Sequence, residues 1–242
     1  MKLLRLAALA ALTLPVYAQT LQSGNMWLVY NGDHPIARSK WGAHLEGQLR
    51  RSDMGLNWQQ LLLRPAVNYQ LTKTIALSGG YTFLQTHPWG AIPNRAPLHE
   101  HRIHEQISYS RKIFKLDFTH RVRLEQRYIG VLGKQVDGSY AIDSFRYQNR
   151  IRYQGRTQIP LKFGDRKNYL ALSDEIFFNY GKNVDRNVFD QNRATISVGR
   201  DIGHQTRFEV GYMEQTLQRR GGQIFENNHT LQITINSRIP IF

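Results

Sequence analysis

The fold is decided by the stretch Ile113-Phe114-Lys115-Leu116-Asp117-Phe118-Thr119-His120-Arg121-Val122-Arg123-Leu124-Glu125-Gln126-Arg127-Tyr128. Its apolar residues alternate with charged and polar residues at a period of two, the spacing at which side chains of a β-strand point to opposite faces. The charged face has no place in the core of a soluble sandwich. A transmembrane β-barrel, which alternates lipid-facing apolar residues with a polar interior, accounts for both faces.

The same alternation recurs along the chain, as in residues 41–50, 145–155 and 231–241. Short connections alternate with longer ones, as in bacterial outer-membrane barrels. We expect strands at about 40–50, 58–70, 74–85, 100–110, 113–128, 142–158, 168–179, 190–200, 205–217 and 228–242. Residues 27–30 also resemble a strand, but an eleventh strand would break the even number typical of these barrels. Either these residues form a short periplasmic or luminal segment, or the total is twelve; we favour ten. The predicted fold class is all-β, an antiparallel transmembrane barrel of about ten strands with both termini on the periplasmic side and an Arg/Glu-lined interior.

The first 18 residues have the form of a secretory signal peptide. Lys2 and Arg5 precede a short apolar run, and Ala18 ends an acceptable cleavage site. A membrane-anchoring helix needs about 20 apolar residues, more than this run provides. We therefore expect a signal peptide over 1–18, a mature chain that starts at Gln19, one barrel domain over 19–242, and a location in the outer membrane of a Gram-negative bacterium.

The chain is strongly basic, with a formal charge of +14 that falls to +12 once Lys2 and Arg5 are removed. The basic residues are spread singly along strands and form no basic tail, which argues against nucleic-acid binding. The alternation predicts a network of charges on the inner face. We expect it to contain Glu46, Arg64, Arg121, Arg123, Glu125, Arg127, Arg150, Arg152, Glu175, Arg193 and Glu209, with Glu100, Arg102, Arg146 and Arg207 on the same face.

The opposite face carries aromatic residues near the strand ends, where membrane barrels have their aromatic girdles. The expected girdle residues are Trp41, Trp58, Tyr69, Tyr81, Phe83, Tyr128, Tyr153, Tyr169 and Tyr212. The last strand ends in Phe242, similar to the signal that the barrel-assembly machinery reads. The expected partners are therefore outer-membrane lipid and this machinery.

Several short sequence segments together resemble a bacterial outer-membrane family catalogued as domain of unknown function number 2490. They are residues 58–65 (WQQLLLRP), 79–81 (GGY), 120–127 (HRVRLEQR), 174–179 (DEIFFN) and 190–193 (DQNR), and the likeness extends over about residues 27–242. The resemblance implies a barrel without an established activity.

Two functional interpretations remain open. The inward arginines outnumber the inward glutamates ten to five, and rings of arginine select anions, which favours a narrow anion-preferring channel or uptake barrel for small anionic solutes. Alternatively, Arg/Glu pairs fill a barrel too narrow to conduct, and the protein has a structural or interaction role.

An outer-membrane hydrolase is a third possibility. It would use His120 with Asn149 and Asp174, but no serine or threonine can be placed beside that histidine, so we expect no enzyme. His99, His101 and His104 could suggest a metal site, but strand geometry places His104 on the opposite face. We expect no metal and no cofactor, since the sequence holds none of the phosphate- or dinucleotide-binding motifs.

Overall fold

The computed structural model describes residues 19–161 and 167–241; the expected signal peptide (1–18) and Phe242 lie outside the described residues. Eleven strands of the described part close into one barrel. They are β1 (Gln19–Pro35), β2 (Trp41–Ser52), β3 (Asn57–Gln70), β4 (Ile75–Thr86), β5 (Leu98–Ile113), β6 (Leu116–Lys134), β7 (Tyr140–Pro160), β8 (Asn168–Tyr180), β9 (Phe189–Gly203), β10 (Thr206–Gln218) and β11 (Ile224–Ser237). The short 3-10 helix η1 (Asp53–Gly55) joins β2 to β3. No helix in the described ranges is long and apolar enough to cross a membrane.

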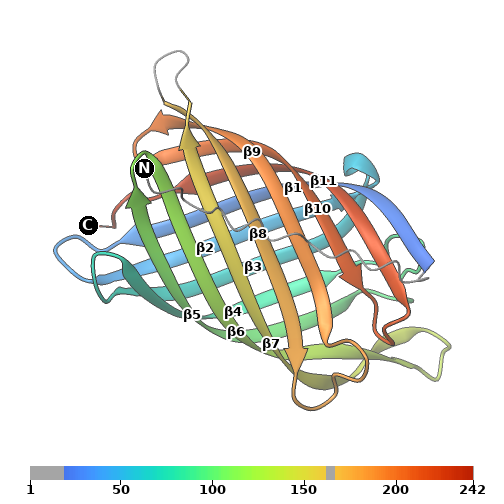
Figure 1. Ribbon diagram of the computed structural model, residues 1–242. Coiled ribbons are helices and arrows are strands. Elements are labelled where there is room, and N and C mark those ends of the chain that lie inside the picture. The colour runs from blue at the N-terminus through green and yellow to red at the C-terminus, as the bar shows by residue number, and fades with distance from the viewer. Residues whose placement is uncertain (1–18, 162–166, 242) are drawn as a thin grey trace, which may run out of the picture.

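Each strand pairs with its neighbours in the chain in antiparallel fashion, and the barrel closes where β1 meets β11 (Figure 1). This closing pair is parallel and runs from Gln19 opposite Ile224 to Gly32 opposite Ser237. The ten expected strands correspond to β2 through β11. The expected number was therefore one too low, and the expected antiparallel order is wrong for this one pair.

The additional strand β1 contains residues 27–30, and its inner face explains why the alternation is hard to see there. Trp27 and Val29 point inward, with 2% and 9% of their surface exposed, and pack with Met213. Leu28 lies on the outer face and is 37% exposed. Because residues on both faces of β1 are apolar at this point, the alternation of apolar and polar residues that marks the other strands is absent here.

An odd number of strands places the two ends of the barrel chain at opposite rims. The rim where β1 begins carries the connections 53–56, 87–97, 135–139, 181–188 and 219–223, and we call it the long-loop rim. The opposite rim, where β11 ends, carries 36–40, 71–74, 114–115 and 204–205, and we call it the short-turn rim (Figure 1). The expectation that both termini lie on one side is wrong, because it depended on an even number of strands.

The outer face is apolar and the inner face polar. Large apolar side chains on the outer face remain exposed in mid-strand, including Val67 at 55%, Ile103 at 51% and Val198 at 53%. The expected aromatic residues Trp41, Trp58, Tyr81, Tyr128, Tyr153 and Tyr212 are exposed on this face, and Tyr69 and Phe83 are half-buried. Tyr169 was misplaced: it is only 8% exposed, and its hydroxyl donates a hydrogen bond to Glu209 inside the barrel.

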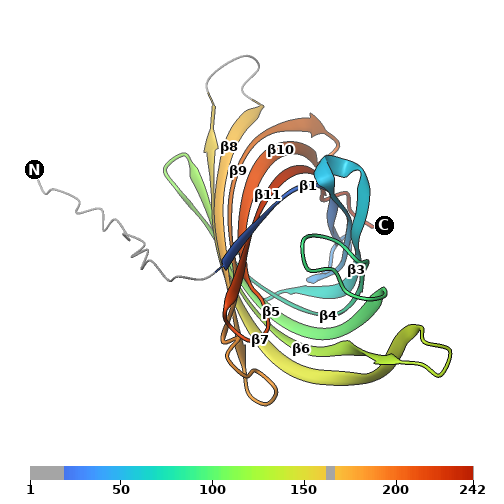
Figure 2. The same ribbon diagram turned by 90° about the vertical axis from the view of Figure 1, so that its right-hand side faces the viewer.

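The longest of these connections, residues 87–97 between β4 and β5, lies in front of the barrel opening at the long-loop rim (Figure 2). Its backbone reaches the opposite side of the rim, where the Ile92 carbonyl accepts a hydrogen bond of 3.4 Å from Arg219. Within the same connection, the guanidinium of Arg95 lies over the ring of Tyr140 at 4.8 Å. The connection therefore narrows the access to the interior from this side.

Candidate functional site: the charged interior

All eleven residues of the expected charge network lie on the inner face of the barrel. Arg64, Arg123, Arg127, Arg150, Arg152, Glu46, Glu125, Glu175 and Glu209 are buried, and Arg121 and Arg193 are half-buried. Alternation along the strands places them there, because residues two apart in a strand share a face. Glu100 and Arg102 are buried on the same face, whereas Arg207 is exposed near the short-turn rim.

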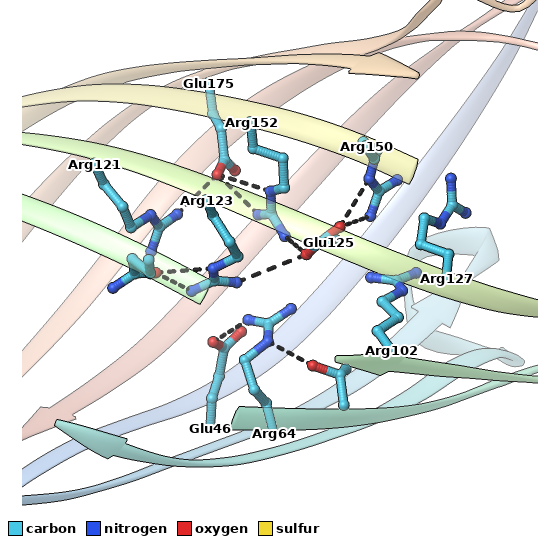
Figure 3. Close-up of polar contacts among 12 residues, drawn as sticks. Glu46, Arg64, Arg102, Arg121, Arg123, Glu125, Arg127, Arg150, Arg152 and Glu175 are labelled. Atoms are coloured by element: carbon cyan, nitrogen blue, oxygen red, sulfur yellow. Dashed lines mark hydrogen bonds and ion pairs between the residues drawn. The ribbon is translucent and has the colours of Figure 1, made fainter. Parts of the chain in front are cut away.

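Glu125 on β6 lies at the centre of the network and is 1% exposed (Figure 3). Arg150 donates to its Oε2 atom from Nε at 2.8 Å and from Nη2 at 2.5 Å. Arg152 donates to its Oε1 atom from Nη1 at 2.8 Å. Arg123 lies further away, with 4.0 Å between its Nη1 atom and Oε1. One carboxylate thus binds two neighbouring arginines of β7 directly.

Two further carboxylates extend the network toward the short-turn rim. Glu175 accepts hydrogen bonds of 2.8 Å from both Arg121 and Arg152, so Arg152 is shared between Glu125 and Glu175 (Figure 3). Glu46 pairs with Arg64, which also donates to the hydroxyl of Thr82 at 3.0 Å. Glu175 thereby links β6, β7 and β8, and the Glu46–Arg64 pair separately links β2 to β3 and, through Thr82, to β4.

On the long-loop side, Glu100 accepts hydrogen bonds from Arg102 at 2.7 Å and from Arg127 at 2.5 Å. Asp190 accepts one from Nη1 of Arg150 at 2.6 Å. Asp190 was missed by sequence reasoning because an irregularity in the β8–β9 register buries both Asp190 and the adjacent Gln191. Simple alternation would place one of the two outside, and the residue pattern carries no sign of the irregularity.

Nearer the short-turn rim, Glu209 forms a separate cluster. It accepts hydrogen bonds from Arg156 at 2.7 Å, from the Tyr169 hydroxyl at 2.8 Å and from Ser197 at 3.1 Å. The half-buried Arg156 and the buried Tyr169 were not among the expected network residues. Glu209 is therefore fully engaged by neighbouring strands and does not join the central network directly.

Three buried or half-buried inward arginines, Arg50, Arg123 and Arg193, differ from the rest because among the described residues they hydrogen-bond only to side-chain amide oxygens. Arg123 donates to Gln106 at 2.8 and 2.6 Å and lines neither of the two cavities described below. Arg50 donates to Gln48 at 2.8 and 2.6 Å and to Gln60. Arg193 donates to Gln191 at 3.1 Å. Both guanidinium groups lie over the ring of Trp27, at 3.9 Å for Arg50 and 5.1 Å for Arg193.

The aromatic residues inside the barrel also contact the paired arginines. The ring of Phe177 has Arg152 at 4.4 Å, Arg193 at 4.9 Å and Arg150 at 5.2 Å. A guanidinium within about 6 Å of a ring is attracted by the negative face of the ring. Trp27 and Phe177 therefore hold Arg193 between β1 and β8. Sequence reasoning missed these two rings because it assigned aromatic residues to the outer face.

The interior contains two cavities along the barrel. The short-turn cavity, about 180 Å³, extends toward Asn31, Arg156 and Asn236, and the long-loop cavity, about 140 Å³, extends toward Thr86 and Trp89. Five residues line both cavities and form what we call the waist: Trp27, Gln48, Arg64, Arg152 and Arg193. The two cavities therefore meet at a ring that holds three arginines.

The arginine surplus is greatest at the long-loop cavity. Seven arginines line it, against two carboxylates, Glu100 and Asp190. These arginines are Arg50, Arg64, Arg102, Arg127, Arg150, Arg152 and Arg193. The short-turn cavity has five arginines and three glutamates in its wall. Both cavities can therefore attract anions, and the long-loop cavity has the larger positive excess.

The other residues considered from the sequence occupy separate places. His99 and His101 lie on the outer face of β5 and His104 on the inner face, and the described residues contain no group of three or more metal-ligating side chains. His120 on the outer face contacts the hydroxyl of Tyr153 at 2.8 Å. Asn149 accepts from Tyr147 and Asp174 accepts from Asn192, so these side chains are bonded to different neighbours.

The comparisons with known proteins agree with the resemblance seen in the sequence. Residues 24–226 match the family described as "Protein of unknown function (DUF2490)". An uncharacterised protein of Methylorubrum extorquens is 24% identical over 225 residues, which cover 90% of this chain and 89% of the relative. The match therefore includes nearly the whole barrel.

Proposed function

The chain belongs to the DUF2490 family of proteins of unknown function, and we propose that it is an outer-membrane barrel whose narrow interior admits small anions in preference to cations. The location is supported by the outer face, on which apolar side chains stay exposed between aromatic residues near the rims. Such a face suits lipid and is costly in water. The form of a signal peptide in residues 1–18 supports export.

The anion preference is supported above all by the wall of the long-loop cavity, where seven arginines face two carboxylates. Positive side chains along a confined path raise the local concentration of anions and repel cations. Three of these seven, Arg64, Arg152 and Arg193, belong to the waist, the part of the wall that the two cavities share. An ion that passes from one cavity to the other must pass these three guanidinium groups.

Planar-bilayer recordings on the refolded protein test this proposal. Under a gradient of potassium chloride, the reversal potential should show that chloride is favoured over potassium. Arg193→Gln should reduce this preference, because it removes a positive charge from the waist without leaving a carboxylate unpaired. Arg207→Gln is the matched control: Arg207 bonds Gln158 near the short-turn rim and lines neither cavity. A barrel that favours potassium, or one unaffected by the Arg193 change, would contradict the proposal.

A second candidate, a non-conducting structural or interaction barrel, is favoured by the central network itself. Glu125 and Glu175 link β6, β7 and β8 inside the barrel, Glu46 links β2 to β3, and small barrels of this kind have room for little more than side chains. This candidate predicts that correctly folded protein, recovered from the outer-membrane fraction, shows no steady conductance at any voltage. The same recordings therefore separate the two candidates.

A further inference from the structure

We propose that the long-loop cavity is a binding site for a small oxyanion, a solute with a phosphate or carboxylate group, held between Arg50 and Arg193 over the ring of Trp27. The inference rests on the proposed function in that both require small anions to reach the interior. It goes further because it names the residues that bind and the class of solute. Three features support it: the arginines that have no carboxylate partner, the aromatic rings that hold them, and the size of the cavity.

The carboxylates at the long-loop cavity and behind its wall are already engaged by five of its arginines. Glu100 binds Arg102 and Arg127, and Asp190 binds Arg150. In the wall behind the cavity, Glu125 and Glu175 bind Arg152, and Glu46 binds Arg64. Within the described residues, this leaves Arg50 and Arg193 with amide oxygens as their only hydrogen-bond acceptors. A buried guanidinium with neutral partners alone is costly, so an oxyanion would be stabilised most strongly at these two residues.

The two guanidinium groups without a carboxylate partner are held in place before any ligand binds. Trp27 is fixed by a hydrogen bond of 2.9 Å from its Nε1 atom to the buried Gln59. Its ring lies 3.9 Å from Arg50 and 5.1 Å from Arg193, and Phe177 lies 4.9 Å from Arg193. Arginine presents a planar fork of donors that matches phosphate and carboxylate oxygens. Because the side chains are already ordered, binding loses little side-chain entropy.

The size of the cavity restricts the solute. A volume of about 140 Å³ is well below that of the pockets of about 300 Å³ or more that hold drug-sized ligands. Trp89 of the 87–97 connection also lines the cavity, and this connection narrows the access from the long-loop rim. The site therefore fits inorganic phosphate or a short carboxylate better than a nucleotide or a sugar phosphate.

The test is a titration of the refolded full chain in detergent with inorganic phosphate, followed by calorimetry and by tryptophan fluorescence. We expect saturable binding, and a change in emission that disappears in Trp27→Phe. Arg50→Gln and Arg193→Gln should each weaken binding by about tenfold or more, since a hydrogen bond to a charged group contributes about 1.5–3 kcal/mol. Arg207→Gln, which removes the same charge outside both cavities, should leave the affinity unchanged.

Arg193→Lys keeps the charge but loses the planar fork, so its affinity should fall between those of the wild type and Arg193→Gln. It also serves if the glutamine variant does not fold, which gel migration with and without boiling reveals. A titration with acetate, at constant chloride concentration, shows whether carboxylates share the site. Chloride alone should bind more weakly, because it has no pair of oxygen atoms to accept the two parallel hydrogen bonds that a guanidinium donates.

The outcomes separate this site from the conduction proposal. Folded wild type without saturable phosphate or acetate binding would overturn the site, even if the barrel conducts chloride. Equal losses in Arg207→Gln and Arg193→Gln would also overturn it, because the effect would then follow total charge. A barrel that conducts nothing but binds phosphate through Arg50 and Arg193 would support the site and contradict the channel.

Discussion

Replacing Glu125 with glutamine is expected to destabilise the barrel strongly. The side chain keeps its size, but the charge that binds Arg150 and Arg152 is removed from a position that is 1% exposed. Breaking a buried ion pair costs about 3–5 kcal/mol, because the remaining partner is left as an unpaired buried charge. Arg150 retains Asp190 at 2.6 Å and Arg152 retains Glu175 at 2.8 Å, so we expect the lower end of this range.

The measurement is urea unfolding of the refolded protein in detergent or lipid vesicles, followed by tryptophan fluorescence. Asp117→Asn is the matched control, since Asp117 pairs with Lys112 at 3.8 Å and their side chains are 50% and 68% exposed. An exposed pair contributes at most about 1 kcal/mol. If the two variants differ by less than about 1 kcal/mol, the interior behaves like a solvated surface and the argument for a stabilising network fails.

A double-mutant cycle isolates the central pair from its surroundings. Arg152→Gln alone leaves Glu125 with Arg150 and leaves Glu175 with Arg121. The double variant should therefore cost less than the sum of the two single variants, with a coupling free energy of about 1–3 kcal/mol. Additive losses would mean that Glu125 and Arg152 do not stabilise each other, although their atoms are within hydrogen-bond distance.

Three further predictions concern the faces of the barrel and its export. Ile196→Arg, at an exposed outer position of β9, should reduce stability in lipid by about 2–4 kcal/mol. The adjacent residue Thr195 lines the short-turn cavity, so Thr195→Arg should reduce stability less. Equal losses of stability in vesicles would contradict the assignment of faces. Tyr169→Phe should lose about 1 kcal/mol in urea unfolding by removing the hydrogen bond to Glu209, and an unchanged midpoint would count against an inward hydroxyl. Intact-mass analysis of protein from the outer-membrane fraction should give a chain that starts at Gln19, and an uncleaved chain would refute the signal-peptide prediction.

The architecture could be predicted from sequence wherever the two faces of a strand differ in polarity. In β6, Arg123 and Glu125 alternate with Val122 and Leu124, and the structure buries the first pair while the outer side chain of Leu124 is 37% exposed. The barrel fold, the ten strands β2–β11 and the inward position of the charged residues followed from this contrast alone.

The remaining features depend on contacts between strands that are distant in sequence. Residues 27–30 of β1 resembled a strand but were not counted, because the expected number of strands was even; that β1 joins the barrel depends on its parallel pairing with β11. Asp190 was missed because a register irregularity is set by the pairing of β8 with β9. Arg193 has amide and aromatic neighbours, whereas Arg152 binds two carboxylates. These partners lie on other strands, so they can be identified only once the positions of those strands are known. A single sequence does not contain this information.

The parallel pairing of β1 with β11 determines which compartment each end of the barrel would face. Gln19 begins β1 at the long-loop rim, and Ile241 follows β11 at the short-turn rim. In a membrane, epitope tags at these two positions would be exposed on opposite sides. An antibody or protease added to intact cells would then reach only one of them. The same arrangement means that the barrel can close only after both its first and its last strand are present, so a chain truncated before β11 would lack the strand that pairs with β1 at the closure.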